Sequence, residues 1–202
     1  MENMKEYWNN IYETKTTDQE SWTQVVPKTS LRFIHSFHLP KDAKIIDIGG
    51  GDNKLVDFLI SEGYENITVL DISFKALQRT KERLGDRAKN VKWIVSDINH
   101  FVPDETYDLW HDRACFHFLT DEEQIKRYIE TVQKSVNGYL VLGTFSQNGP
   151  AKCSGLNVMR YDETTLLNAF QNAFDKIRCI TEDHLTPAGK LQNFIFCGFK
   201  KK

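Results

Sequence analysis

The sequence predicts an α/β protein in which helices cover both faces of a seven-stranded, mostly parallel sheet whose last strand is antiparallel. Three observations lead to this fold class. Short runs of β-branched and aromatic residues alternate with segments in which apolar residues recur every three or four positions. The central runs are apolar almost throughout, as expected for strands that are covered on both faces. Only a short polar connection separates the last two runs, and it is too short for a crossover helix.

Seven short apolar runs, each bounded by turn residues, are the predicted strands. They span residues 44–49, 66–72, 91–97, 107–112, 138–145, 176–183 and 192–199. A helical pattern separates most consecutive runs, which predicts right-handed crossovers and parallel pairing. The connection "HLTPAGK" instead predicts that the last two strands form an antiparallel hairpin.

Helices are predicted where apolar residues recur with helical spacing. They span residues 54–62, 74–84, 121–135 and 162–174. Residues 146–160 lack such a pattern, and we expect them to form one long irregular loop. Loops of that length in compact domains are usually functional or mobile.

Size and charge bound the class of protein. At 202 residues and 23.5 kDa, the chain has the size of one domain, and we expect a single domain over residues 1–202. A net charge of -2 and a pI near 6.3 give no basic surface, so charge does not favour nucleic-acid binding. The polar first residues and the lack of a long apolar run predict a cytoplasmic protein without membrane contact.

The cysteines do not indicate a metal site. Cys115, Cys153, Cys179 and Cys197 lack the CxxC spacing of zinc sites and the pattern of a small disulfide-stapled domain. We expect most of them to be small core residues. Cys153 lies among Gly, Pro and Ser, and we expect it to be the most exposed of the four.

Three consecutive glycines in the stretch "IIDIGGGDNKLVDFL", residues 45–59, are the clearest functional signal. In an open α/β sheet, ligands bind outside the carboxyl ends of the strands. Gly49, Gly50 and Gly51 lack β-carbons, so they permit a tight turn and let a ligand approach the backbone and the start of the next helix. A plain strand-to-helix turn is the alternative explanation, because such glycine patterns are weak on their own.

Three aspartates strengthen the hypothesis of a ligand site. Asp47 precedes the glycines, while Asp71 and Asp97 end the second and third predicted strands, so the three carboxylates should meet at one edge of the sheet. A carboxylate at the end of the second strand can accept hydrogen bonds from both hydroxyls of a ribose. Asp71 is also suited to cap the following helix, and Asp97 to initiate the turn before Asn99.

These motifs resemble those of the class I S-adenosylmethionine-dependent methyltransferases, whose fold is Rossmann-like. "DIGGGDN" is similar to their first motif, acid-x-Gly-x-Gly-x-Gly, with Asn53 in place of the last glycine. "VLDIS" resembles their ribose-binding strand end, and "VSDI" resembles their adenine-binding segment. The resemblance spans about residues 40–200 and implies S-adenosylmethionine as the cofactor. It implies that the methionine portion lies at Asp47, Gly49, Gly50 and Gly51, the ribose at Asp71 and Ile72, and the adenine at Asp97 and Ile98.

A nicotinamide-dependent oxidoreductase is the main alternative, since it shares the glycine turn and an acid about 20 residues further on. Three features favour the methyltransferase. The last glycine of GxGxxG is missing near Lys54, Asp47 within the first strand is typical of S-adenosylmethionine sites, and the terminal hairpin fits the methyltransferase sheet. A third hypothesis is a protein that binds S-adenosylmethionine without catalysis.

The segment "WHDRACFHFLTDEE", at the end of the fourth strand, supplies the candidate catalytic residues His111 and Asp112. Both should lie beside the methyl donor, where His111 either contacts the cofactor or acts as a general base. Arg113 is a candidate substrate-binding residue that could hold a carboxylate or pair with Asp112. Because adjacent residues of a strand point to opposite faces, we do not expect His111 and Asp112 to share a metal ion.

The segment "WNNIYETKTTDQESWTQVVPKTSLRFI" resembles the lead-in of thiopurine-type and protein-lysine methyltransferases, and the later motifs resemble small freestanding bacterial members. This resemblance implies a helical lid within residues 1–40 over a core at 41–202. Trp8, Tyr12 and Trp22 are candidate substrate-binding residues, since aromatic faces favour cations, or they pack against the sheet edge. The methyl acceptor is expected to be a small molecule or a protein side chain that offers N, O or S.

Overall fold

A seven-stranded sheet forms the centre of the computed structural model, which describes residues 2–202 and the side chains from Met4 onward. The strand order is β3-β2-β1-β4-β5-β9-β8. From β3 to β5, all adjacent strands pair in parallel. Strand β9 is antiparallel to both of its neighbours, β5 and β8. The strands are β1 (Lys44–Ile48), β2 (Asn66–Asp71), β3 (Val91–Val95), β4 (Tyr107–Arg113), β5 (Val136–Phe145), β8 (Phe174–Leu185) and β9 (Leu191–Lys201). The predicted fold class is confirmed.

Six α-helices surround the sheet in the described chain. They are α1 (Glu2–Thr14), α2 (Lys28–Ser36), α3 (Leu55–Ser61), α4 (Phe74–Leu84), α5 (Glu122–Ser135) and α6 (Glu163–Phe170). Short 3-10 helices are η1 (Thr17–Gln19), η2 (Gly85–Asn90), η3 (Ile98–His100) and η4 (Phe116–Phe118). Within residues 2–202, none of the helices has both the length and the apolar character of a membrane span.

The core lies in two layers because alternate residues of each strand point to opposite faces of the sheet. On one face, α2, α3 and α4 pack against side chains such as Ile45 and Leu109. On the other face, α5 and α6 pack against side chains such as Ile46 and Trp110. Burial on both faces explains why the central strands are apolar in sequence without a break.

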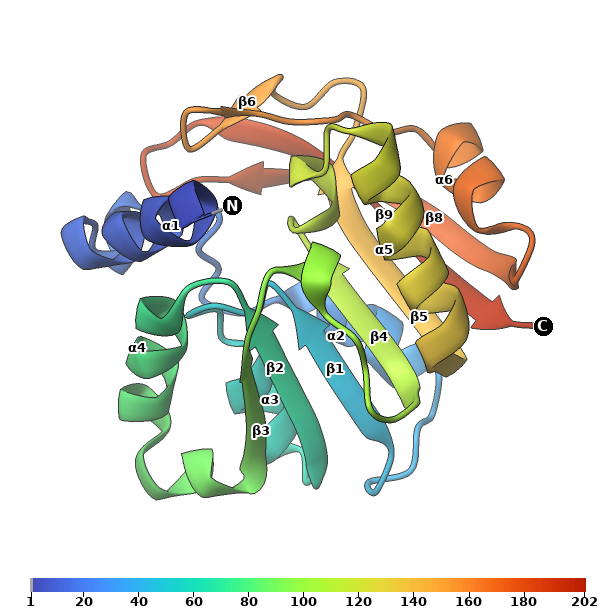
Figure 1. Ribbon diagram of the computed structural model, residues 1–202, viewed down its shortest axis with the longest axis horizontal. Helices are drawn as coiled ribbons and strands as arrows, with labels where there is room; N and C mark the ends of the chain where they lie inside the picture. Colours follow the sequence, from blue (N-terminus) through green and yellow to red (C-terminus); the bar gives the residue numbers. More distant parts are fainter. Residues whose placement is uncertain (1) are drawn as a thin grey trace.

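The carboxyl ends of the central strands form the edge where a ligand is expected. The chain leaves β1 toward β2 on one side, while β4 and β5 follow on the other, so the strand order reverses between β1 and β4. Such a reversal opens a crevice at the carboxyl ends. In Figure 1, α1 and β6 lie beyond the arrowheads of β1 and β2, at this end of the sheet.

The segment 146–160 is more ordered than predicted. It contains a small antiparallel hairpin of β6 (Lys152–Cys153) and β7 (Leu156–Asn157). The hydroxyl of Tyr7 in α1 donates a hydrogen bond to the backbone carbonyl of Ser154 between these strands. The expectation that Cys153 is exposed was wrong: its exposure is 6%, because the hairpin folds back onto the core.

The terminal hairpin also differs from the prediction in detail. The helix expected to reach residue 174 ends at Phe170, and buried Phe174 instead starts β8, opposite Lys201 of β9. Cys179 and Cys197 lie directly opposite each other in this hairpin and form a disulfide, where separate core cysteines were expected. Their pairing depends on strand register, which the cysteine spacing in the sequence does not reveal.

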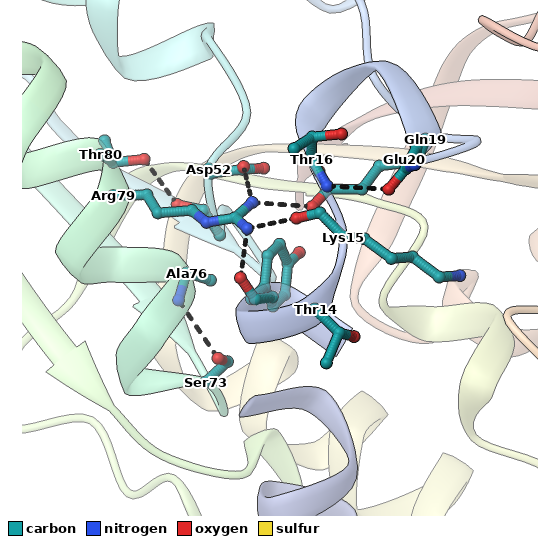
Figure 2. A network of polar contacts seen from close by, with 12 residues as sticks. Thr14, Lys15, Thr16, Gln19, Glu20, Asp52, Ser73, Ala76, Arg79 and Thr80 are labelled. Atoms are coloured by element: carbon teal, nitrogen blue, oxygen red, sulfur yellow. Dashed lines mark hydrogen bonds and ion pairs between the residues drawn. The ribbon is translucent and has the colours of Figure 1, made fainter. Parts of the chain in front are cut away.

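Arg79 of α4 holds the N-terminal segment against the glycine turn, as Figure 2 shows. Its Nη1 donates to Glu20 Oε1 at 2.9 Å and to Asp52 Oδ2 at 3.2 Å. Its Nη2 donates to the backbone carbonyls of Tyr12 and Lys15. One guanidinium therefore connects α1 and the segment after it to the residue that follows the three glycines.

The charges in this cluster balance. Glu20 and Asp52 are buried and share one guanidinium. Burial, and next the charge of Asp52, raise the pKa of Glu20 to about 8. At neutral pH Glu20 is therefore mostly protonated, and its contact with Arg79 Nη1 stands beside the ion pair of Arg79 with Asp52.

Replacing Arg79 with Gln should lower the free energy of unfolding by about 3 kcal/mol, because it leaves buried acids without their cation. Urea unfolding of the variant and the wild type gives this difference. Lys75→Gln is a matched control, since it breaks an exposed ion pair with Glu13 between the same two helices. The control should change the free energy by less than about 1 kcal/mol. Equal effects of the two substitutions would contradict the role given to Arg79.

Candidate active site

The turn after β1 requires glycine at more than one position. A β-carbon at Gly50 would lie 2.5 Å from Val69 Cγ1 and 2.8 Å from Asp47 Oδ2. Gly51 has a φ of +44°, which side chains disfavour, and a β-carbon there would lie 2.8 Å from the Tyr12 hydroxyl oxygen. The turn is therefore packed tightly against Val69, Asp47 and Tyr12, while Gly49 and Gly50 line the cavity.

Asp47, buried at 1% exposure, fixes the turn to the neighbouring strand. Its Oδ1 lies 2.7 Å from His111 Nδ1, and its Oδ2 accepts a hydrogen bond of 3.1 Å from Asn53 Nδ2. Asn53, which replaces the last glycine of the expected motif, also accepts from the N–H of Leu55 at 2.8 Å. This side chain thus starts α3 and orients Asp47 at the same time.

His111 connects Asp47 to helix α2. Its Nε2 lies 2.8 Å from the hydroxyl oxygen of Ser30. Carboxylate oxygens accept hydrogen bonds and a hydroxyl can donate one, so the contacts fit an imidazole whose Nδ1–H donates to Asp47 and whose Nε2 accepts from Ser30. Ser30 was not identified from the sequence, because nothing in the local pattern around a single Ser indicates a buried contact with a distant strand.

Asp71 ends β2 as predicted, whereas β3 ends at Val95 and Asp97 follows it as the N-cap of η3; both line the same cavity. Asp71 Oδ1 accepts from the N–H of Ser73 at 2.7 Å, while the Ser73 side chain caps α4. Burial is the main reason that the pKa of Asp71 rises to about 7. Asp97 Oδ1 accepts from the backbone and side chain of Asn99, so it also starts the short helix η3.

A continuous cavity of about 440 Å³ follows the carboxyl ends of the strands. It extends from the predicted adenine and ribose positions past the glycine turn to the predicted acceptor region. Of the expected site residues, its lining includes Trp8, Tyr12, Trp22, Gly49, Gly50, Asp71, Ile72, Asp97, Ile98, His111 and Arg113. Asp47 and Gly51 lie behind this lining, where they support His111 and Tyr12.

Aromatic side chains from the N-terminal segment form the wall opposite the sheet. Trp8 of α1 contacts Trp22 and Phe118 edge-on, with ring centroids 6.0 and 5.1 Å apart. Tyr12 contacts Trp22 with centroids 5.8 Å apart. Phe118 was not predicted to line a cavity, since aromatic residues near strand ends are more often packing residues.

The catalytic role expected for Asp112 disagrees with its position. Its side chain points to the opposite face from His111, is fully buried and does not line the cavity. Its Oδ2 accepts from the Tyr128 hydroxyl at 2.6 Å, and its Oδ1 accepts from the N–H groups of Cys115 and Phe116. Asp112 therefore orders the loop after β4 and has no route to a reacting atom.

Arg113 does not pair with Asp112. Its Nη1 donates to the backbone carbonyl of Trp22 at 3.0 Å. Its guanidinium carbon lies 4.6 Å from the centroid of the Phe194 ring. Because Arg113 and His111 are two residues apart in one strand, both side chains face the cavity side of the sheet.

Several known proteins are similar to this chain in sequence or in fold. Residues 45–137 match a family model described as a methyltransferase domain. The eEF1A lysine and N-terminal methyltransferase of Mus musculus is 26% identical over 141 residues, which cover 68% of this chain and 20% of that protein. The malonyl-(acyl-carrier protein) O-methyltransferase 2 of Ilyobacter polytropus is 26% identical over 105 residues, which cover 52% of this chain and 40% of that protein.

The chain thus spans only 20%, 40% and 41% of the length of the first three curated relatives. Among solved structures, a SAM-dependent methyltransferase from Anabaena variabilis has the same fold. Its TM-score is 0.75 at 14% identity, with 100% of this chain and 94% of that chain covered. Residues 45–137 of this chain are thus similar to a methyltransferase domain, and the chain shares its fold with a solved SAM-dependent methyltransferase.

Proposed function

We propose that this chain transfers the methyl group of S-adenosylmethionine to an N, O or S atom of an acceptor that binds beside Arg113. The single observation that carries the proposal is the continuous cavity that joins Asp71 and Asp97 to Arg113. One curated relative is named an eEF1A lysine and N-terminal methyltransferase and another a malonyl-(acyl-carrier protein) O-methyltransferase, so the proposal includes protein and small-molecule acceptors.

The residues fit the cofactor. A ligand can approach the glycine turn only from the cavity, and Asp71 Oδ2 lies next to the turn. In the proposal, Gly49 and Gly50 hold the methionine portion, and Asp47 and Gly51 support them from behind the lining. Asp71 and Ile72 hold the ribose, and Asp97 and Ile98 hold the adenine. When bound, S-adenosylmethionine supplies a methyl group that the positive sulfonium already activates.

The protein has two tasks in such a reaction, which are orientation of the acceptor and exclusion of water. Trp8, Tyr12 and Trp22 close the cavity from the N-terminal side and serve as the lid in this proposal. Their ring faces also favour the sulfonium cation. Arg113 holds the acceptor at the opposite wall.

His111 is the proposed route for a proton when the acceptor arrives protonated. Both of its ring nitrogens are engaged, by Asp47 and by Ser30. A proton therefore reaches Nε2 through the Ser30 hydroxyl or after that hydrogen bond opens, while Asp47 stabilises the resulting imidazolium.

Calorimetric titration against S-adenosylmethionine, S-adenosylhomocysteine and NAD tests the cofactor. The proposal expects binding of the first two and not of NAD, whereas the oxidoreductase hypothesis expects the reverse. Incubation of radiolabelled S-adenosylmethionine with cell extract, followed by separation by size, then tests transfer. Cofactor binding without any labelled product would support the non-catalytic hypothesis.

Binding of S-adenosylhomocysteine should weaken about tenfold between pH 8 and pH 6, because only ionised Asp71 accepts hydrogen bonds from both ribose hydroxyls and its pKa is about 7. The carboxyl is ionised above pH 7 and becomes protonated below it, so affinity is lost as the pH falls. Titration calorimetry at both pH values gives the ratio.

Asp71→Asn is the control for this pH effect. The variant should bind weakly, with the same affinity at pH 6 and pH 8, since the amide does not titrate. Glu20, whose pKa is about 8, remains near the site in this variant. A tenfold pH effect that persists in Asp71→Asn would assign it to another group such as Glu20.

Neutral His111 should carry its proton on Nδ1, because Nδ1 faces the acceptor Asp47 and Nε2 faces a hydroxyl donor. Long-range 15N-1H correlation spectra distinguish the two ring tautomers. The Ser30→Ala variant should keep the Nδ1–H form, because Asp47 is still in place. A predominant Nε2–H form in the wild type would rule out the proposed proton route.

A further inference from the structure

We propose that the Tyr12 hydroxyl binds the ribose of the cofactor together with Asp71, so that the bound cofactor joins helix α1 to the end of β2. This inference rests on the proposed function, in which Tyr12 belongs to the lid, and it adds a cofactor contact to that lid. The first observation is the position of the two side chains. A β-carbon at Gly51 would lie 2.8 Å from the Tyr12 hydroxyl oxygen and 3.1 Å from Asp71 Oδ2. Both oxygens therefore lie beside the same glycine of the turn.

The Tyr12 hydroxyl is free to bind a ligand. Tyr12 is 7% exposed and lines the cavity. Its hydroxyl has no hydrogen-bond partner in the part of the chain that the structure describes, and it is not among the polar atoms that protein shields completely. The hydroxyls of Tyr107 and Tyr161 also lack a partner there, but they are shielded on all sides. Because Tyr12 lines the cavity, the open side of its hydroxyl faces the cavity.

Asp71 supplies the acceptor that complements this donor. Its Oδ1 accepts from the N–H of Ser73 at 2.7 Å, and the N–H of Gly51 also donates to this carboxylate. Each carboxylate oxygen has two acceptor sites, so Asp71 can still accept hydrogen bonds from a ligand in the cavity. A ribose hydroxyl both donates and accepts. Neighbouring hydroxyls of one ribose can therefore donate to Asp71 and accept from Tyr12 at the same time.

Tyr12 keeps its proton under the conditions in which Asp71 is ionised. Burial, and next the charge of Asp71, raise the pKa of Tyr12 well above its usual value. Asp52 and Glu20 act in the same direction, while Arg79 opposes them. The Tyr12 hydroxyl is therefore a neutral donor beside a carboxylate that only accepts, which is the pair that a diol requires.

The position of Tyr12 is fixed before a ligand arrives. Nη2 of Arg79 donates to the backbone carbonyl of Tyr12, and the guanidinium carbon lies 5.6 Å from the centroid of its ring. One turn earlier in α1, Asn9 Oδ1 accepts from the Ser73 hydroxyl at 2.8 Å and from the N–H of Lys75 at 3.3 Å. Residues three apart share one face of a helix. Helix α1 thus presents Asn9 and Tyr12 to the segment after β2, and little freedom is lost on binding.

The test removes one hydroxyl from the protein and one from the ligand. The full-length protein is titrated by calorimetry at pH 8 with S-adenosylhomocysteine and with its 2′-deoxy and 3′-deoxy analogues, and competition titrations extend the measurement to weak analogues. Tyr12→Phe keeps the ring and should weaken binding of S-adenosylhomocysteine about fivefold, the loss expected for one hydrogen bond. The loss should vanish with one of the two deoxy analogues, which already lacks the hydroxyl that Tyr12 binds, and persist with the other.

Tyr7→Phe is the matched control. Tyr7 lies in the same helix, but its hydroxyl donates to the backbone carbonyl of Ser154, and Tyr7 does not line the cavity. This substitution loosens the lid without removing a contact with the cofactor. It should therefore change the affinity for S-adenosylhomocysteine and for both deoxy analogues by one common factor. The melting temperature of Tyr12→Phe should stay close to that of the wild type, because its hydroxyl bonds to no described residue.

The outcomes separate the two proposals. If the wild type does not bind S-adenosylhomocysteine, the proposed function fails. If it binds but Tyr12→Phe has no effect, the ribose inference alone is overturned. The same holds if Tyr12→Phe weakens all three ligands equally, because its hydroxyl would then contact another part of the cofactor or act through the lid. Selective loss with one deoxy analogue in Tyr7→Phe as well would also overturn it.

Discussion

The buried contact between Asp47 and His111 is the interaction on which the site depends. The two residues are direct partners in the register of β1 and β4, the strands between which the strand order reverses. Their hydrogen bond joins the glycine turn to the strand that presents Arg113. Because Ser30 completes the chain on the other side, α2 is tied to the same point. Small changes there would shift the cofactor end and the acceptor end together.

A second constraint comes from the N-terminal segment, which closes the cavity without belonging to the sheet. Arg79 fixes this segment to the turn through buried acids and backbone carbonyls. Elsewhere in α1, the Tyr7 hydroxyl is hydrogen-bonded to the β6–β7 hairpin. The aromatic wall is thus attached on both sides of the cavity. Its attachment uses charge balance and hydrogen bonds, while the sheet is held together by apolar burial.

The proposed cofactor residues and the proposed acceptor residues lie in different parts of the chain. The matched methyltransferase domain, residues 45–137, contains the glycine turn, Asp71 and Asp97. Much of the wall around the proposed acceptor lies outside it, in the N-terminal segment and in the β6–β7 hairpin. A shared cofactor would explain the match over residues 45–137, while the proposed acceptor site depends on segments outside that range. Arg113 belongs to the matched segment and lies between the two regions.

The sequence by itself determined the sheet, its one reversed strand and the positions of Asp47, Asp71 and Asp97, because these follow from local periodicity and from where strands end. The tertiary structure decided which side chains meet. Ser30 reaches His111 across 81 positions, Cys179 and Cys197 pair only in one strand register, and Asp112 faces Tyr128 rather than the cavity. Such contacts depend on the packing of distant segments, which the local residue pattern does not specify.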